Sequence, residues 1–344
     1  MMFAMQHRLQ SFETLSNTLR FSARYLRTKT VRKMPLPKFE KRLDIAIIGQ
    51  PNVGKSVLLN CLIKQKVAAA TRKRHTTRSN IVGVFNHRNV QLVFYDTPGF
   101  VRHVDAQKAD IKALRGISAT MASKADVVLL VVDASKRVRP QDQDTFAEMV
   151  KISRAGSKEE VILVMNKVDA VEPKGLLLDL VDTYVSLING VKLAITEANK
   201  ACLDTTTFMI SGQYNDGVMD MKNYLISLAK PKPWLIPRGS AVATTLTHEE
   251  RVEEVMLEKL LENVHEEVPY ICDIHCRPLV QTDADSLRID VDIKVDNEGQ
   301  KKIIVGQQGR SVVKIRQDAV EDLEKIFAGK QVLLFIWVEV RSGK

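Results

Sequence analysis

Two shortages, of cysteine and of long apolar runs, narrow the class of protein that this sequence can specify. Its 344 residues include only four cysteines and no Cys-x-x-Cys pair, which excludes a disulfide framework and indicates a reducing compartment. No run approaches the roughly 18 consecutive apolar residues of a membrane span, so we expect a soluble protein. The apolar residues that are present make up 45% of the chain, which is enough to form the hydrophobic cores of two domains.

The net charge of +10 is unevenly distributed along the chain. Residues 1–42 hold ten Lys/Arg and two Glu, residues 43–244 hold 27 basic and 19 acidic residues, and residues 245–344 hold 14 and 20. The first segment is rich in Arg, Ser and Thr, which is typical of a mitochondrial targeting segment; a retained basic arm is the alternative. In the acidic last segment, any nucleic-acid contact must come from a local basic patch.

A glycine-rich loop follows the apolar run 43–48 and reads Gly-Gln-Pro-Asn-Val-Gly-Lys-Ser over residues 49–56. Glycines at its two ends allow a turn so tight that the backbone N–H groups point at a polyphosphate. The lysine supplies charge, the serine can ligate Mg²⁺, and the helix expected after the loop adds its positive end. The predicted nucleotide contacts here are Gly49, Asn52, Val53, Gly54, Lys55, Ser56 and Val57.

A second polyphosphate signal ends a predicted hairpin. Residues 81–85 and 90–95 alternate as two strands, and Asp96-Thr-Pro-Gly99 follows directly. Taken alone, this sequence is an ordinary turn. At the end of a buried strand beside a phosphate loop, however, Asp96 can hold Mg²⁺ through water, and the Gly99 N–H can sense a γ-phosphate.

Guanine specificity is predicted from Asn166-Lys-Val-Asp169. Strand signals at 127–134, 161–165 and 207–211 alternate with helical segments, which indicates a parallel, doubly wound sheet. At the end of one such strand, Asp169 can accept from guanine N1 and N2, while Asn166 offers its amide to the base and the Lys167 stem covers the ring. Adenine lacks that donor pair, so we expect GTP to be preferred by on the order of 10⁴-fold. The segment Ser211-Gly212 completes the base pocket.

In this order, these motifs resemble the Era family of GTPases, and within it the mitochondrial members of animals. Thr71-Arg-Lys-Arg-His-Thr-Thr-Arg78 matches the family's first switch. The resemblance implies that Thr77 (less readily Thr76) binds Mg²⁺, that Asn52 binds K⁺, and that Lys55, Thr77 and Gly99 are the catalytic groups. Phe100 stands where many GTPases place a water-orienting Gln, which implies slow intrinsic hydrolysis. Residues 187–204 form an insertion whose role is not readable.

The C-terminal third resembles a type II KH domain. Prolines in Lys230–Pro237 predict a semi-rigid linker, and the segments that follow are a helix at 249–264, strands at 270–277 and 287–295, a helix at 312–326 and a strand at 332–340. A Gly-x-x-Gly loop at 306–309 lets an RNA backbone approach closely. The predicted RNA contacts are Lys301, Lys302, Gly306, Gln307, Gln308, Gly309, Arg310 and Lys314. Because strand alternation separates His275 from Cys272 and Cys276, we expect no zinc site there.

Together these features predict four segments: a targeting segment or basic arm (1–42), an α/β P-loop GTPase domain with a mixed, mostly parallel doubly wound sheet (43–229), a linker (230–247) and an α+β type II KH domain (248–344). The resemblance implies a GTPase that uses GTP/GDP, Mg²⁺ and K⁺, binds single-stranded small-subunit rRNA, and assembles the small ribosomal subunit in the mitochondrial matrix. A GTPase translation factor and a constitutive RNA-binding ribosomal protein are the alternatives.

Overall fold

A computed structural model describes residues 40–68, 81–100, 108–156, 160–195, 205–237, 244–264 and 268–341. Three of the sequence predictions therefore lie wholly or largely outside the described residues: the N-terminal segment, the first switch with Thr77, and part of the 187–204 insertion. No helix in the described ranges is long and apolar enough to cross a bilayer.

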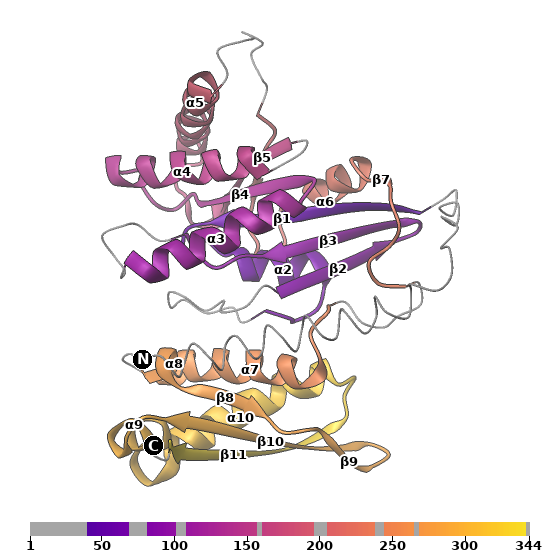
Figure 1. Cartoon of the computed structure of the whole chain (residues 1–344), viewed down its shortest axis with the longest axis vertical. Helices are drawn as coiled ribbons and strands as arrows, with labels where there is room; N and C mark the ends of the chain where they lie inside the picture. The colour runs from indigo at the N-terminus through magenta and orange to yellow at the C-terminus, as the bar shows by residue number, and fades with distance from the viewer. Residues whose placement is uncertain are drawn as a thin grey trace, which may run out of the picture. The chain divides into compact units, whose positions relative to one another are not determined.

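The first domain is built on a seven-stranded sheet with the order β2-β3-β1-β4-β5-β6, in which β7 also pairs with β1 (Figure 1). Its strands are β1 Lys41–Gly49, β2 Ile81–His87, β3 Val90–Asp96, β4 Val127–Asp133, β5 Glu160–Asn166, β6 Thr207–Ile210 and β7 Lys230–Pro231. The pairs along the path from β3 to β6 are parallel, whereas β2 runs antiparallel to β3 at the edge. The predicted mixed, mostly parallel sheet is confirmed.

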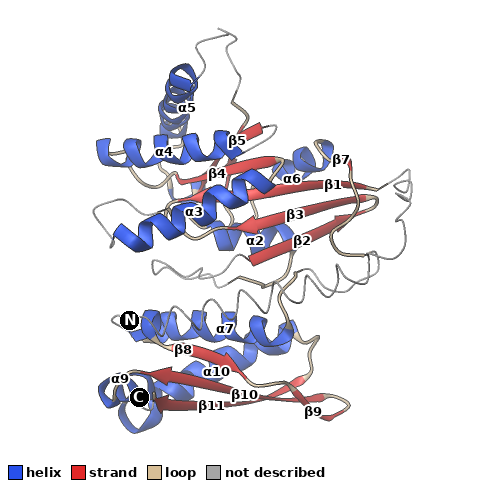
Figure 2. Ribbon diagram, in the orientation of Figure 1, coloured by secondary structure: helices blue, strands red, loops and turns tan. Residues whose placement is uncertain are grey.

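Helices cover both faces of this sheet, which explains why its central strands are apolar on both sides. They are α2 Lys55–Ile63, α3 Lys108–Lys124, α4 Pro140–Gly156, α5 Leu176–Ile195 and α6 Val218–Ser227, with a short 3₁₀ helix at Val168–Ala170. Side chains of α2 and α6 pack with Ile45 and Ile47 in one core cluster, and those of α3, α4 and α5 pack with Ala46 and Ile48 in another (Figure 2). The carboxyl ends of the parallel strands thus meet at one edge.

The segment predicted as a linker begins as part of this domain. Residues 230–231 pair antiparallel with β1, and the Trp234 indole N–H donates to the Lys41 carbonyl at 3.1 Å. The buried Gln91 side chain accepts from the Leu235 N–H at 2.6 Å and donates to the Ile236 carbonyl at 2.9 Å. Hydrogen bonds to strands, rather than proline stiffness alone, therefore fix residues 230–236. Likewise, the first part of the predicted insertion, up to residue 195, belongs to α5.

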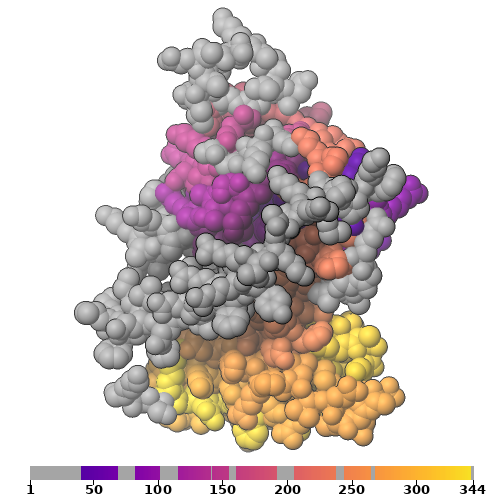
Figure 3. Space-filling view, turned by 45° about the vertical axis from the view of Figure 1, so that its right-hand side comes forward, coloured from indigo at the N-terminus to yellow at the C-terminus, as the bar shows by residue number. Residues whose placement is uncertain are grey.

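The C-terminal domain has a four-stranded sheet with the order β11-β10-β8, and β9 also pairs with β10. Its elements are α7 His248–Asn263, α8 Val268–Ile271, β8 Asp273–Cys276, β9 Val280–Asp283, β10 Ser286–Val295, α9 Glu298–Val305, the 3₁₀ helix Gln307–Gly309, α10 Arg310–Ile326 and β11 Gln331–Val340. In the space-filling view these residues run from orange to yellow (Figure 3). The parallel β10–β11 pair and the helix–loop–helix between its strands confirm the predicted KH fold.

Periodicity predicted this domain's core but not all of its elements. The odd-numbered apolar residues of β10 are buried with the inner faces of α7 and α10. The strand expected at 270–277 is shorter, because residues 268–271 form a helical turn first. The strand β9 was not predicted: its four residues are all exposed, so no apolar alternation marks it. On the outer face of the sheet, Leu333, Phe335 and Trp337 remain substantially exposed.

Candidate nucleotide and RNA sites

The phosphate loop is a cradle into which no side chain fits. A Cβ added to Gly49 or Gly54 would lie closer than 3.0 Å to the Val131 carbonyl or the Asn166 amide, and Gly54 also has φ +94°. A Cβ on Gly99 would lie 2.9 Å from the Pro51 ring and backbone. The glycines therefore let the loop pack directly against β4, Asn166 and the segment after β3, as the tight turn of a phosphate loop requires.

Lys55 opens α2, and its ammonium turns back over the loop. Its Nζ donates to the carbonyls of Gly49 at 3.1 Å and Gln50 at 3.0 Å. Burial lowers the pKa of Lys55 to about 8, although the charge of Asp96 acts in the opposite direction. Because carbonyls only partly replace water around the ammonium, this cation gains from an anion placed beside it. Lys55 thus lies against the backbone of the loop.

Ser56 and Asp96 come from α2 and the end of β3, and the fold brings them together. The Ser56 hydroxyl donates to Asp96 Oδ2 at 2.8 Å, and both side chains are buried. A hydroxyl and a carboxylate beside a phosphate cradle are the hard oxygen donors that Mg²⁺ prefers, so the residues fit this ion. Thr77, the third predicted ligand, lies outside the described residues.

Asn166 joins two walls of the predicted pocket. Its Nδ2 donates to the Val53 carbonyl at 2.8 Å, and its Oδ1 accepts from the Gly212 N–H at 2.9 Å. The side chain is buried and links the phosphate loop to the segment after β6. Because an amide nitrogen carries two N–H groups, the second one remains for the predicted contact with the base. Asn166 therefore positions the walls of the pocket, and Gly212 contributes to that link through its backbone.

Lys167 extends along the loop and ends between two acceptors. Its Nζ donates to the Asn52 carbonyl at 2.6 Å and to Asp133 Oδ2 at 2.8 Å. Burial alone would raise the pKa of Asp133, but hydrogen bonds from Lys167 and Ser135 outweigh it, and the pKa lies below its usual value. Sequence reasoning missed Asp133. Its position at the end of β4, next to Asn166 in the β4–β5 register, was the available signal.

The remaining base-pocket residues lie at adjacent strand ends. Asp169 is exposed in the 3₁₀ helix that follows β5, so its carboxylate is open to a ligand. Ser211 is buried after β6, and its hydroxyl accepts from the Tyr214 N–H at 3.3 Å. Because β5 and β6 pair in parallel, these two segments emerge side by side. The geometry is compatible with a purine held between them.

Phe100 cannot orient a water molecule. Its side chain is 2% exposed and belongs to the core cluster on the α3–α5 face of the sheet. The Phe100 N–H donates to the Gly49 carbonyl at 2.9 Å, and the Arg115 guanidinium carbon lies 5.2 Å from the ring centroid. The residue thus anchors the segment after β3 to the phosphate loop and leaves water positioning to other groups.

A cavity of about 560 Å³ lies beside the loop and overlaps the predicted nucleotide site only in part. Its lining includes the predicted contacts Asn52 and Val53, together with Phe100 and basic side chains of the β4–α4 connection. Lys55, Ser56, Asp96 and Asp169 do not line it. The cavity therefore borders one side of the predicted site.

In the KH domain, the two glycines of the Gly-x-x-Gly loop differ. Both have positive φ, +74° at Gly306 and +76° at Gly309. A Cβ on Gly306 would lie 2.6 Å from the Ser311 Cβ, whereas a Cβ on Gly309 would meet nothing within 4 Å. Gly306 is therefore required by the turn itself. Of the two, Gly309 has the open surface that the sequence analysis expected at both positions.

The loop tip and its flanks present donors and apolar atoms together. Gln307 and Gln308 are exposed, and Gln308 adopts φ +53°. The predicted basic residues surround them, with Lys302, Arg310 and Lys314 exposed and Lys301 half-buried. Sequence reasoning missed two apolar neighbours, Ile303 and Val313, which are 37% and 50% exposed. Exposed apolar surface beside cations suits nucleotides, whose bases and phosphates need both.

No metal cluster competes with this assignment in the described parts of the chain. Cys272 and Cys276 are buried in the KH core and form no disulfide, and His275 is exposed on the opposite face of β8 from Cys276, as alternation predicted. Among the described residues, no group of three or more His, Cys, Asp or Glu side chains could hold a metal ion.

Comparison with known sequences finds relatives over most of the chain. A family model described as "50S ribosome-binding GTPase" matches residues 44–167, and one described as "KH domain" matches residues 279–344. GTPase Era of Mesorhizobium japonicum is 33% identical over 299 residues, which cover 87% of this chain and 88% of that protein. Mitochondrial GTPase Era of Danio rerio is 29% identical over 333 residues, covering 85% and 74%.

Solved structures agree with this result. A crystal structure of Era in complex with MgGDPNP and nucleotides 1506–1542 of 16S ribosomal RNA superposes with a TM-score of 0.72 and 30% identity, covering 88% of this chain and 94% of that one. A variant of Aquifex aeolicus Era bound to GDP·AlF₄⁻ gives a TM-score of 0.71 and 30% identity, covering 87% and 94%. Both domains are thus matched together.

The pKa of Lys55 predicts a pH dependence of nucleotide binding. Phosphates stabilise the ammonium, so the bound state holds more protons than the free state, and affinity must fall as pH rises through about 8. Between pH 7.5 and pH 9, we expect nucleotide affinity to weaken by roughly five- to tenfold. Fluorescent-analogue titrations measure this effect. The variant Lys55→Met should bind weakly at a pH-independent level, and a flat profile in the parent protein would contradict the assignment.

Proposed function

The chain belongs to the Era family of GTPases, and on that premise we propose that it is a GTP-hydrolysing assembly factor for the mitochondrial small ribosomal subunit. It binds a single-stranded segment of small-subunit rRNA through its KH domain. One observation carries the proposal: the same chain contains two sites. The first is a phosphate loop with the buried Lys55 and a Ser56–Asp96 pair, and the second is a Gly-Gln-Gln-Gly loop whose two glutamines are exposed.

The residues divide the work on GTP. Backbone N–H groups of the loop and the Lys55 ammonium hold the phosphates, and Asp169 reads the guanine. Ser56, Asp96 and Thr77 hold Mg²⁺, which when bound neutralises charge on the β- and γ-phosphates. Because Phe100 is buried, hydrolysis by the isolated protein is slow. Asn52, at φ +64° in the loop, is the proposed ligand of a K⁺ ion that raises the rate.

RNA binding rests on the KH domain and on the relatives. Five basic residues and no acid lie between Gly299 and Gln317, in a domain that is otherwise acidic. The similar Era structure contains nucleotides 1506–1542 of 16S ribosomal RNA, which supports a small-subunit rRNA segment as the partner. The loop clamps about four nucleotides, and Ile303 and Val313 contact their bases.

Action in the mitochondrial matrix is supported by two observations. The Danio rerio relative is a mitochondrial Era, and residues 1–42 carry ten basic and two acidic residues. Bacterial Era proteins are similar over the same domains, so the location depends on this N-terminal segment. Intact Lys55 and Asp169 argue against a constitutive ribosomal protein, which would not need them.

Guanine recognition is tested by Asp169→Asn. The change replaces the acceptor of guanine N1 and N2 with an amide, so we expect GTP affinity to fall by roughly 100-fold and affinity for xanthosine triphosphate to rise. Nucleotide titrations with both triphosphates measure the exchange. The matched control is Glu172→Gln, which removes an exposed carboxylate nearby and should change neither affinity. Unaltered GTP preference in Asp169→Asn would reject the base-pocket assignment.

The K⁺ proposal is tested by phosphate release in KCl and NaCl at equal ionic strength. We expect faster hydrolysis in KCl, and we expect Asn52→Gly to abolish the difference. Glycine keeps the positive φ at this position and removes only the side chain. Equal rates of the parent protein in both salts would end the K⁺ proposal and leave the GTPase assignment intact.

RNA binding is tested at the loop tip, where both glycines can be kept. The double change Gln307→Asp and Gln308→Asp places two negative charges where phosphates approach, so affinity for a single-stranded small-subunit rRNA fragment should fall at least roughly tenfold. The neutral pair Gln307→Asn and Gln308→Asn should retain binding. GTP affinity without RNA should be unchanged in both. Full RNA affinity in the Asp variant would refute the KH assignment.

A further inference from the structure

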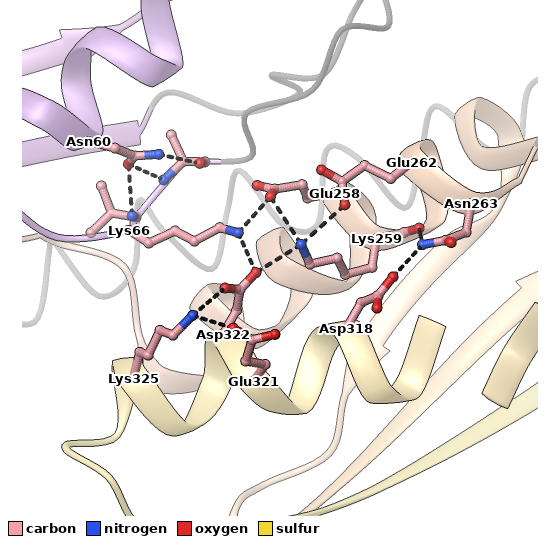
Figure 4. A network of polar contacts seen from close by, with 12 residues as sticks. Asn60, Lys66, Glu258, Lys259, Glu262, Asn263, Asp318, Glu321, Asp322 and Lys325 are labelled. Carbon is pink, nitrogen blue, oxygen red and sulfur yellow. Dashed lines mark hydrogen bonds and ion pairs between the residues drawn. The ribbon is translucent and has the colours of Figure 1, made fainter. Parts of the chain in front are cut away.

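A network of ion pairs joins the GTPase domain to the KH domain through one side chain, Lys66 (Figure 4). Its Nζ lies 2.5 Å from Glu258 Oε1 on α7 and 2.6 Å from Asp322 Oδ2 on α10. Lys259 of α7 also contacts Asp322, at 2.9 Å, and Glu262, at 3.1 Å. One cation of the first domain therefore bridges two helices of the second.

This network is screened from water more than an ordinary surface ion pair. The Glu258 side chain is 5% exposed and that of Lys66 is 27% exposed. Burial would raise the pKa of Asp322, but hydrogen bonds from Lys66 and Lys259 outweigh it and hold the pKa below its usual range. The carboxylate of Asp322 therefore stays charged. Because Glu258 and Asp322 are both largely buried, their contact with Lys66 retains strength that exposed pairs lose to solvent.

The two domains carry net charges of opposite sign, which favours a contact between a cation of the first domain and carboxylates of the second. Residues 43–244 carry 27 basic and 19 acidic residues, whereas residues 245–344 carry 14 and 20. Lys66 and Lys259 both contact Glu258 and Asp322, Lys259 also contacts Glu262, and Lys325 contacts Asp322 at 3.8 Å. Withdrawal of Lys66 thus removes one cation from both Glu258 and Asp322.

Lys66 is also connected to the predicted nucleotide site through the helix that precedes it in the sequence. It follows α2, the helix that Lys55 and Ser56 begin. The Asn60 side chain of that helix accepts from the N–H groups of Val67 at 2.9 Å and Ala68 at 3.1 Å, and donates to the Ala68 carbonyl at 2.9 Å. A few residues further on comes the segment predicted to carry the Mg²⁺ ligand Thr77. Lys66 is therefore joined through Asn60 to the helix that Lys55 and Ser56 begin.

We propose that the Lys66–Glu258–Asp322 network is the latch through which nucleotide state and RNA binding influence each other. The inference rests on the proposed function, because it assumes that both ligands bind. Nucleotide bound at the start of α2 acts on this helix, the Asn60 contacts transmit the effect to Lys66, and the ion pairs to α7 and α10 change occupancy. RNA bound to the KH domain acts on the same equilibrium from the other side, as thermodynamic linkage requires.

The test measures the affinity of a non-hydrolysable GTP analogue with and without the rRNA fragment. In the full chain we expect RNA to change this affinity by at least roughly fivefold. In Lys66→Met, which keeps the aliphatic stem and removes the charge, the ratio should approach one. Each ligand should bind alone within about twofold of the parent, because the change lies outside both sites. The matched control is Lys325→Met, which removes a cation that contacts the same Asp322 from within α10. This control should keep the full ratio.

A second measurement reports the contact directly. A carbodiimide joins an ammonium and a carboxylate only when they touch, so it should link Lys66 to Glu258 or Asp322, and mass spectrometry of the digest quantifies the product. We expect the yield to differ at least twofold between GTP-analogue and GDP states. Equal yields, or an unchanged ratio in Lys66→Met, would overturn the latch while both ligands still bind. Loss of RNA or GTP binding by the parent protein would instead refute the proposed function.

Discussion

Backbone crowding around the phosphate loop is the constraint on which the rest of this structure depends. β1 ends against the Val131 carbonyl so closely that a methyl group at Gly49 has no room, and the same holds for Gly54 against Asn166. Such proximity requires that β4 and β5 be placed to within a few tenths of an ångström. Two apolar layers, one on each face of a fully buried central sheet, provide that placement because close-packed cores deform little. The buried environment of Lys55 follows from this packing.

The sequence predicted what depends on local chemistry and on periodicity. Glycine spacing located the loop with Ser56 at the start of α2, the polar residues at strand ends pointed to Asp96 and Asp169, and perfect alternation located β10. Sequence reasoning missed contacts that are decided by a distant partner. The bonds of Asn166 to Val53 and Gly212 are one example, because nothing in the neighbouring sequence indicates them. Asp133 carries no motif of its own, and only the β4–β5 register reveals it.

The two glycines of the KH loop illustrate the same limit. A Gly-x-x-Gly pattern indicates positions where a side chain is excluded, but it does not show whether a ligand or the protein itself excludes it. At Gly306 the obstacle is Ser311, and at Gly309 the space is open. Charge placement is similarly hidden. The C-terminal domain has a net negative charge, yet its Gly-x-x-Gly loop is basic. Two of its carboxylates, Glu258 on α7 and Asp322 on α10, pair with Lys66 of the first domain.

The short strand β7 has a mechanical consequence. It pairs with the first residues of β1, the strand whose far end becomes the phosphate loop. A pull on the KH domain passes down the chain and first meets the bonds of Thr244 and Thr245 to the Val82 carbonyl. It then meets the bonds of Gln91 to Leu235 and Ile236, followed by Trp234 and the pairs of Lys232 with Asp44 and Asp126. Because these contacts lie in series along the chain, tension must break them in turn before it reaches the start of β1.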